Sequence, residues 1–451
     1  MKKNVIPWQR SPTRDQTTKT SPRRGRRHFM RGTCTTVIGA AWGDEGKGKA
    51  VDALGIDSTA TVRFNGGANA GHTLVVGDQK YVTHLLPCGI VRPNMQNIVG
   101  PAVLCDLEVI REEVALARKH FAFVLLDESA PIVLPIHKLI DAGRERAAKA
   151  GALGTTKRGI GPASADFWAR RSPRLGDLVN KDQIVDRLRA ARYYEELLAV
   201  SRFLETEAPG LDETIEWLTQ FSDVIVPLLG DARARVHQLL AERKNVLFEG
   251  AQGVLLDTIQ GSSPYTTSSI CTAAGVANTL GIYIPHSVIG VSKAYTTRVG
   301  AGPFPTELSG DTGNKLRKAG KEYGATTGRP RRCGWLDLMA LRYAVRVGGI
   351  TNLTITKLDI LSGMDEVQMC TDYMLRGKSV NRFTTLTTEI LDNVEPVYTT
   401  FPGWTKNIQG CRRIDDLPSA ARDYLATIEA FTEVPISMIG VGPEREQLIK
   451  I

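Results

Sequence analysis

A β-branched run at residues 34–43 leads into a glycine-rich loop and then a helical stretch that ends at Gly55. An apolar run, a glycine loop and a second apolar run follow at residues 60–76. Further strands are expected at 287–295, 352–359 and 434–442, a helix followed by a strand at 232–253, and helices at 107–120 and 182–206. Alternating strands and helices predict an α/β protein, here a single large domain with a central, mainly parallel β-sheet flanked by helices. Such sheets bind ligands at the carboxyl ends of their strands.

The composition is that of a globular protein, since 42% of the 451 residues are hydrophobic. No run of about 18 apolar residues occurs, so we expect no membrane-spanning helix and a soluble, cytoplasmic protein. The seven cysteines are scattered and form no CxxC pair. This argues against a disulfide framework or a zinc cluster and predicts reduced, buried thiols.

Residues 1–31 carry the whole excess of positive charge. They hold ten Lys and Arg against one acid, whereas residues 32–451 hold 47 basic and 47 acidic residues. The segment lacks an apolar core and is therefore no secretory signal. Three interpretations stay open: a disordered leader with Met30 as an alternative start, an electrostatic arm for nucleic acid or an anionic surface, or an organelle transit peptide.

The loop GDEGKGK at residues 43–49 resembles a phosphate-binding loop but departs from the Walker pattern. Ala41 stands where the first glycine would, and Gly48 replaces the Ser or Thr that would hold magnesium. A glycine loop that opens a helix still offers free N–H groups to an anion, and Lys47 can add a charged contact. We expect a P-loop-like nucleotide site; the alternative is a tight turn with solvated charges.

Two carboxylates, Asp44 and Glu45, stand in this loop although they would repel phosphates. The motif NAGHT at residues 69–73 places His72 in a second glycine loop beside another strand end. An isolated histidine is more often structural, but this one is placed to meet the same ligand. Asp44 and His72 are therefore a candidate acid/base pair, while Glu45 has no assigned task.

The segment TKLD at residues 356–359 follows an apolar strand and resembles the [NT]KxD element of guanine-nucleotide proteins. The carboxylate of Asp359 could accept from both guanine N1–H and the exocyclic amine, whereas adenine would leave it unpaired, so GTP is favoured over ATP. A second motif, GATTGRPRRCGWLD, gathers Arg329, Arg331 and Arg332. These guanidinium groups would suit a small dicarboxylate, and a solvated basic loop is the alternative.

Together the motifs resemble the adenylosuccinate synthetase family, in the family's order and over roughly residues 32–450. The segments that carry the likeness are WGDEGKGK, NAGHT, GTTKRGIGPASADFWARR, VLFEGAQGVLLD, PYTTSS, KAYTTRVGAGPFPTEL, GATTGRPRRCGWLD and TKLD. The resemblance implies a ligase of purine biosynthesis (EC 6.3.4.4) whose catalytic domain spans residues 32–451. It would join L-aspartate to IMP with GTP, through 6-phosphoryl-IMP, to give adenylosuccinate, GDP and phosphate.

The resemblance also implies roles for individual residues. Asp44 would be the base that removes the N1 proton of IMP, and His72 would support phosphoryl transfer as an acid or hydrogen-bond donor. One Mg²⁺ per active site would be held by Asp44 and by the backbone carbonyl of Gly71.

Three sets of binding residues follow from the resemblance. The implied IMP-binding residues are Asp44, Lys47, Asn69, Ala70, Gly71, His72, Thr156, Arg170, Gln252, Thr267 and Arg329. The implied aspartate-binding residues are Ala325, Thr326, Thr327, Gly328, Arg329, Pro330 and Arg331. The implied GTP-binding residues are Gly43, Asp44, Glu45, Gly46, Lys47, Gly48, Lys49, Gly71, His72, Thr73, Arg331, Lys357, Leu358, Asp359, Gly440, Val441 and Gly442.

The resemblance further implies a homodimer in which Arg170 reaches the IMP site of the neighbouring subunit. The chain departs from the family at Lys157, where a glycine is usual, at residues 440–442, where Ser-Thr-Gly is usual, and at QGSSPYTTSS, where HGSYPYVTSS is usual. Two alternatives stay open. One is a relative that adds aspartate to a guanine deoxynucleotide, which lacks the aspartate that this chain keeps at position 44. The other is a non-catalytic GTP-binding regulator.

Overall fold

The computed structural model describes residues 32–283, 287–324, 328–380 and 388–451. Its largest sheet has ten strands, all parallel to their neighbours except the antiparallel pair β17 and β18. In spatial order they are β18 (Leu448–Lys450), β17 (Ile436–Gly440), β13 (Asn352–Thr356), β9 (Ser287–Lys293), β1 (Cys34–Gly39), β8 (Val246–Gly253), β2 (Ala60–Arg63), β5 (Gln96–Val99), β6 (Phe123–Asp127) and β7 (Leu229–Gly230). The predicted α/β fold with a central, mainly parallel sheet is confirmed.

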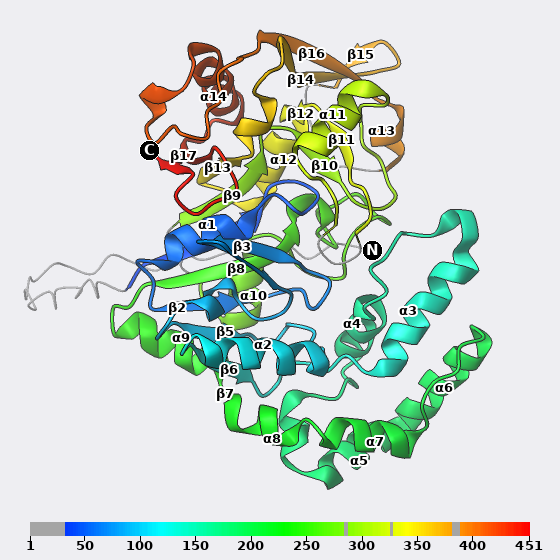
Figure 1. The fold of residues 1–451 in the computed structure, drawn as a ribbon. Helices are drawn as coiled ribbons and strands as arrows, with labels where there is room; N and C mark the ends of the chain where they lie inside the picture. The colour runs from blue at the N-terminus through cyan, green and yellow to red at the C-terminus, as the bar shows by residue number, and fades with distance from the viewer. Residues whose placement is uncertain (1–31, 284–286, 325–327, 381–387) are drawn as a thin grey trace, which may run out of the picture. The chain divides into compact units, whose positions relative to one another are not determined.

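Smaller sheets join this one (Figure 1). They are the hairpin of β3 (His72–Val76) and β4 (Gln79–Thr83), the pair β10 (Thr296–Arg298) and β11 (Arg332–Gly334), and a sheet of β12 (Leu336–Asp337), β14 (Glu366–Leu375), β15 (Lys378–Ser379) and β16 (Glu395–Pro402). The α-helices are α1 (Lys47–Gly55), α2 (Leu107–Lys119), α3 (Pro135–Ala148), α4 (Ile160–Trp168), α5 (Lys181–Arg189), α6 (Tyr193–Phe203), α7 (Leu211–Thr219), α8 (Ser222–Ile225), α9 (Ala232–Ala241), α10 (Ala274–Leu280), α11 (Asp311–Ala319), α12 (Leu338–Gly348), α13 (Thr388–Asn393) and α14 (Ser419–Thr432).

The sheet is buried on both faces. On β1, Val37 belongs to one apolar cluster and its neighbour Ile38 to another, because successive side chains of a strand point to opposite faces. One cluster includes side chains of α1 and α2, and the other those of α9, α12 and α14. Central parallel strands covered in this way read as continuous apolar runs, which is why the sequence identified them.

The predicted helix at 182–206 is wrong, because the chain breaks there into α5 and α6. Ala191 and Arg192 take positive φ angles of 48° and 59°, which no α-helix can include. The apolar periodicity continues on both sides of this kink, so the pattern alone did not reveal it. The predicted helix at 107–120 corresponds to α2 and the one ending at Gly55 to α1.

Residues 31–451 form one compact unit. The basic segment 1–31 lies outside the described residues, so its three interpretations stay predictions. None of the helices in the described part of the chain is long and apolar enough to cross a membrane.

Lys157 gives a test of the local backbone, because its φ of 56° is left-handed and its side chain is exposed. Lys157→Gly should raise the free energy of unfolding by about 0.5–1 kcal/mol, since a residue with a Cβ pays about 1–2 kcal/mol there and the entropy of glycine takes back part of the gain. Denaturant unfolding measures the change.

Lys315→Gly is the matched control, because Lys315 is also exposed but lies within helix α11. It should lower the free energy of unfolding by about 1 kcal/mol. Equal losses in the two variants would contradict the left-handed conformation at Lys157.

Candidate active site

The predicted ligand loops meet at one edge of the sheet. Because β1, β9 and β13 are parallel neighbours, the loops that follow β1 and β13 leave from the same side. The hydroxyl of Thr356, the last residue of β13, donates to the carbonyl of Glu45 at 2.6 Å. On the other flank, a Cβ added to Gly48 would lie 3.3 Å from the Cβ of His72. The segments TKLD and NAGHT therefore both contact the first glycine loop.

Asp44 is held by an arginine from far along the chain. Its Oδ2 accepts from Nε of Arg331 at 2.7 Å, and Nη1 of Arg331 donates to Glu322 at 2.7 Å. Asp44 has a left-handed backbone, with φ of 59°, and its side chain keeps 30% exposure. Its Oδ1 accepts no hydrogen bond from the residues that the structure describes. The predicted base is thus oriented and still open to a ligand.

Glu45 has a structural task that the sequence did not reveal. Its buried carboxylate accepts the N–H groups of Ala41 and Gly43 at 3.1 and 2.8 Å through Oε1. Its Oε2 pairs with the ammonium of Lys47 at 2.6 Å. A Cβ at Gly39 would lie 2.4 Å from this carboxylate, so the backbone of β1 leaves just enough room for it. Glu45 therefore shapes the loop from within and fixes Lys47.

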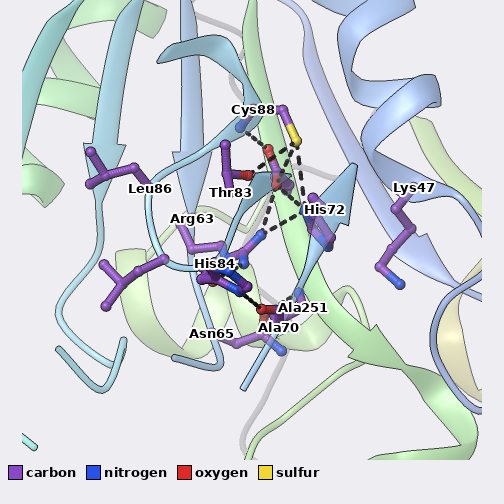
Figure 2. Close-up of polar contacts among 12 residues, drawn as sticks. Lys47, Arg63, Asn65, Ala70, His72, Thr83, His84, Leu86, Cys88 and Ala251 are labelled. Carbon is purple, nitrogen blue, oxygen red and sulfur yellow. Dashed lines mark hydrogen bonds and ion pairs between the residues drawn. The ribbon is translucent and has the colours of Figure 1, made fainter. Parts of the chain in front are cut away.

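His72 is the first residue of β3, and not part of the glycine loop as predicted (Figure 2). Its Nδ1 makes a short hydrogen bond to Oε1 of Glu249, which lies on β8. Arg63 also binds this carboxylate oxygen, at 2.7 Å. An ionised carboxylate can only accept, so the Nδ1 proton points at Glu249 and Nε2 is the ring atom left for a ligand. Asp44 and His72 are thus held by different partners, and no hydrogen bond joins them among the described residues.

Burial sets the charge of this histidine. Desolvation and the neighbouring Arg63 lower the pKa of His72, whereas Glu249 opposes the shift. Burial acts against the charge on Glu249, but His72 and Arg63 hold its pKa down at about 2. We take Glu249 as ionised and His72 as neutral near pH 7, with Arg63 as the counter-charge.

Cys88 completes the cluster around Glu249. Its N–H donates to Oε2 of Glu249 at 2.8 Å, and its Sγ lies 3.3 Å from Oε1. The ligand atoms of His72, Cys88 and Glu249 lie within 4.8 Å of one another, a spacing at which they could hold a metal ion. The guanidinium of Arg63 already supplies positive charge to this carboxylate, so we assign the cluster no metal.

The predicted guanine end of the site is linked by hydrogen bonds to the C-terminal loop. Lys49 donates to the carbonyls of Gly442 and Gln447 at 2.6 and 2.8 Å, and burial lowers its pKa to about 8. The predicted GTP ligand Lys49 is thus directed at residues 440–442. A Cβ on Gly440 would lie 3.2 Å from the Cα of Thr356, so this loop is adjacent to the TKLD segment.

Asp359 and Lys357 point to different partners. Oδ2 of Asp359 accepts from Gln409 at 3.2 Å, and burial raises the pKa of Asp359. Lys357 has a left-handed φ of 57° and donates to Gly320 and Glu322 at 2.6 and 2.7 Å. Asp359 is half-buried, and an exposed glutamine occupies one of its oxygens where a guanine would donate.

The predicted IMP residues include buried polar atoms that lack partners. Both amide atoms of Gln252, at the end of β8, and Oδ1 of Asn69 are buried without a hydrogen bond. Nδ2 of Asn69 makes a long bond of 3.4 Å to Oγ1 of Thr267. Buried polar groups are rarely left unpaired, so these atoms are the ones that a bound ligand would satisfy.

The predicted aspartate loop is only partly described. Residues 325–327, three of the predicted ligands, lie outside the described residues. Arg329 donates to the carbonyl of Thr155 at 2.8 Å, beside the predicted ligand Thr156. Arg329 and Arg331 therefore reach different segments, as expected of arginines two residues apart.

Comparison with known proteins agrees with this geometry. A family model described as adenylosuccinate synthetase matches residues 36–449. The adenylosuccinate synthetase of Halothermothrix orenii is 43% identical over 420 residues, which cover 92% of this chain and 97% of the relative. That of Stenotrophomonas maltophilia is 43% identical over 421 residues, with the same coverage.

The chain belongs to the adenylosuccinate synthetase family. It is a ligase of purine biosynthesis (EC 6.3.4.4) that joins L-aspartate to IMP with GTP as co-substrate. The fully ligated adenylosuccinate synthetase of Plasmodium falciparum has the same fold, with a TM-score of 0.88 and 37% identity over 93% of this chain and all of that one. The succinoaminodeoxyadenylate synthetase of cyanophage S-2L, bound to dGMP and dATP, has a TM-score of 0.58 and 20% identity over 93% and 95% of the two chains, which is a likeness of fold. The comparisons support IMP over the guanine-nucleotide alternative.

Sequence reasoning missed the charged residues that support the family's motifs. Arg63, Glu249 and Lys293 each stand in an apolar strand, and such buried charges need partners, a signal that could have identified them. Glu322 lies in a loop and gave no such signal.

Glu249→Gln tests the task of the cluster around His72. The amide keeps the shape of the carboxylate but loses the charge that fixes the Nδ1 proton and neutralises Arg63. We expect kcat to fall by about 10- to 100-fold, as when the support of a functional histidine is removed, and stability to drop. Steady-state kinetics and thermal unfolding measure both.

Glu113→Gln is the control, because Glu113 is equally buried but binds the backbone N–H groups of residues 84–86. Burial raises the pKa of Glu113 to about 7, so the neutral amide resembles a form that it already populates. An equal loss of kcat in both variants would show that Glu249 has no special link to His72.

Proposed function

We propose that Asp44 is the base that activates IMP in this chain. The observation that carries the proposal is the ion pair from Oδ2 of Asp44 to Arg331, which places the carboxylate between the first glycine loop and the aspartate loop. O6 of IMP is a weak nucleophile and a poor leaving group. Removal of the N1 proton by Asp44 raises the electron density on O6, which then attacks the γ-phosphate of GTP. The amino group of aspartate displaces phosphate from C6 of the resulting 6-phosphoryl-IMP.

His72 would act on the polyphosphate through Nε2. This atom is the free one, since Nδ1 is bound to Glu249. The negative charge of GTP and the carboxylate of Glu249 both favour a proton on Nε2, which then donates to a phosphate oxygen as charge develops.

The donor set at Asp44 and Gly71 fits magnesium, because carboxylate and carbonyl oxygens are its preferred ligands and one oxygen of Asp44 accepts no bond from the described residues. When bound, Mg²⁺ would offset the charge of the polyphosphate. The chain contributes the rest, as Lys47 and the N–H groups at the start of α1 face the same anion.

The remaining residues would bind the three substrates as the family pattern implies. Asp359 would accept from guanine, with Gln409 giving way, and Lys357 and the loop 440–442 would border the base. Residues 325–331 would hold aspartate through Arg329 and Arg331. The unpaired amide atoms of Gln252 and Asn69 support an IMP site beside Thr267.

We also propose that the active form is a homodimer. Arg170 follows α4, is exposed, and has a left-handed φ of 65° that turns the chain after the helix. Trp168, two residues before it, is 68% exposed, an unusual cost for an indole in water. An arginine and a tryptophan are the residues most often found at the centre of protein interfaces, which supports a shared site between two copies.

The catalytic domain would span residues 32–451 and act in the cytoplasm, and the basic segment 1–31 would not be needed for turnover. No observation in the described residues separates a leader, a transit peptide or a nucleic-acid arm.

Asp44→Asn removes the base and keeps the shape of the side chain. With GTP, Mg²⁺ and aspartate, we expect the wild type to form adenylosuccinate from IMP and not from dGMP, and the variant to lose at least about 10³-fold in kcat, since proton transfer contributes about 10²–10⁴-fold. Binding of GTP should change little. Turnover near the wild-type rate in the variant would refute the assignment, and turnover of dGMP in the wild type would favour the other substrate.

Mixing two inactive variants tests the shared site. In a dimer of one Asp44→Ala and one Arg170→Ala chain, one of the two sites keeps both residues, so random mixing should restore about a quarter of the wild-type activity. Asp44→Ala mixed with itself is the control. No recovery after verified subunit exchange would contradict the role of Arg170.

A further inference from the structure

We propose that Glu322, a residue outside the binding motifs, is the positioning residue that holds Arg331 and Lys357 in place for aspartate and GTP. The inference rests on the proposed function for those two cations. Glu322 lies in the loop between α11 and β11, and its side chain is fully buried.

Four donors from four segments converge on this one carboxylate. Oε1 accepts from the hydroxyl of Tyr295 at 2.5 Å and from Nζ of Lys357 at 2.7 Å. Oε2 accepts from Nζ of Lys293 at 2.8 Å and from Nη1 of Arg331 at 2.7 Å. A carboxylate has about four lone-pair sites, so all of its capacity is used.

The carboxylate is ionised in this setting. Burial works against its charge, but Lys293, Lys357 and Arg331 together hold the pKa of Glu322 well below its usual range. Burial lowers the pKa of Lys293 to about 8, and Glu322 opposes that shift. Lys293 is therefore the buried counter-charge, and its ammonium also binds Thr297 at 2.8 Å.

The other two cations exceed what neutralisation of Glu322 requires. Asp44 pairs with Arg331, and Lys293 with Glu322, which leaves the charge of Lys357 uncompensated within this group. Lys357 is 31% exposed, whereas Lys293 is 2% exposed. A surplus positive charge that faces outward at the ligand edge of the sheet suits anionic substrates.

The position of each cation is set from two sides. Lys357 is fixed by Glu322 and by the carbonyl of Gly320, and Arg331 by Glu322 and by Asp44. The backbone strengthens this link, since the N–H of Arg331 donates to the carbonyl of Glu322 at 2.9 Å. Loss of the carboxylate charge would leave three cations close together without their common partner, so Arg331 and Lys357 would move apart.

The effect should be selective among substrates. The residues proposed for IMP, such as Gln252, Asn69 and Thr267, make no hydrogen bond to Glu322 in the described part of the chain. Glu322 therefore supports the GTP and aspartate sides of the centre and not the IMP side.

Glu322→Gln in the full-length chain is the test. We expect KM for GTP and KM for aspartate each to rise by about tenfold or more, the loss of roughly one charge-assisted hydrogen bond, while KM for IMP stays within about twofold. Glu307→Gln is the matched control, because Glu307 is also paired with an arginine, Arg332, but at the surface of a neighbouring loop. It should leave all three KM values unchanged.

A second variant separates positioning from stability. In Glu322→Gln with Lys293→Met, the buried counter-charge is removed too, so the melting temperature should recover in part while KM for GTP and aspartate stays high. If the single variant does not fold, this double variant carries the test. Recovery of both KM values with stability, or an equal rise in KM for IMP, would overturn the proposal. Lack of synthetase activity in the wild type would instead be a failure of the proposed function.

Discussion

The ion pair between Asp44 and Arg331 is the contact on which the active centre depends, because it joins loops that are 287 residues apart in the chain. Glu322 holds the far side of the same guanidinium, so the position of Asp44 follows from a buried carboxylate in a third segment. Without substrates, Arg331 compensates the charge of the base. Anionic substrates that bind Arg331 would weaken that hold and leave the carboxylate free to take a proton.

A common pattern extends through the site: each group that faces a substrate is backed by a buried glutamate. Glu45 backs Lys47, Glu249 backs His72, and Glu322 backs Arg331 and Lys357. A polyphosphate site needs cations fixed in advance, and cations close together repel one another unless anions lie between them. The carboxylates that looked out of place in a phosphate loop therefore have two different tasks: Asp44 faces the ligand and Glu45 supports the loop.

Much of the fold could be predicted, because buried parallel strands are continuous apolar runs and their glycine loops are visible in the sequence. The kink at residues 190–192 could not, since the left-handed backbone of Ala191 and Arg192 leaves the apolar periodicity intact. In the site, motifs located Asp44, His72 and Asp359. They could not locate Glu322, because its link to Lys293 and Lys357 exists only once strands β9 and β13 lie side by side.

The central claim is that the base beside the polyphosphate turns O6 of IMP into the attacking nucleophile. Transfer of an isotope tests it most directly. IMP labelled with oxygen-18 at position 6 is incubated with the protein, unlabelled GTP, Mg²⁺ and aspartate, and the released phosphate is examined by mass spectrometry. We predict that the phosphate carries the label, because O6 leaves with the phosphoryl group. Unlabelled phosphate, formed together with adenylosuccinate, would contradict the account.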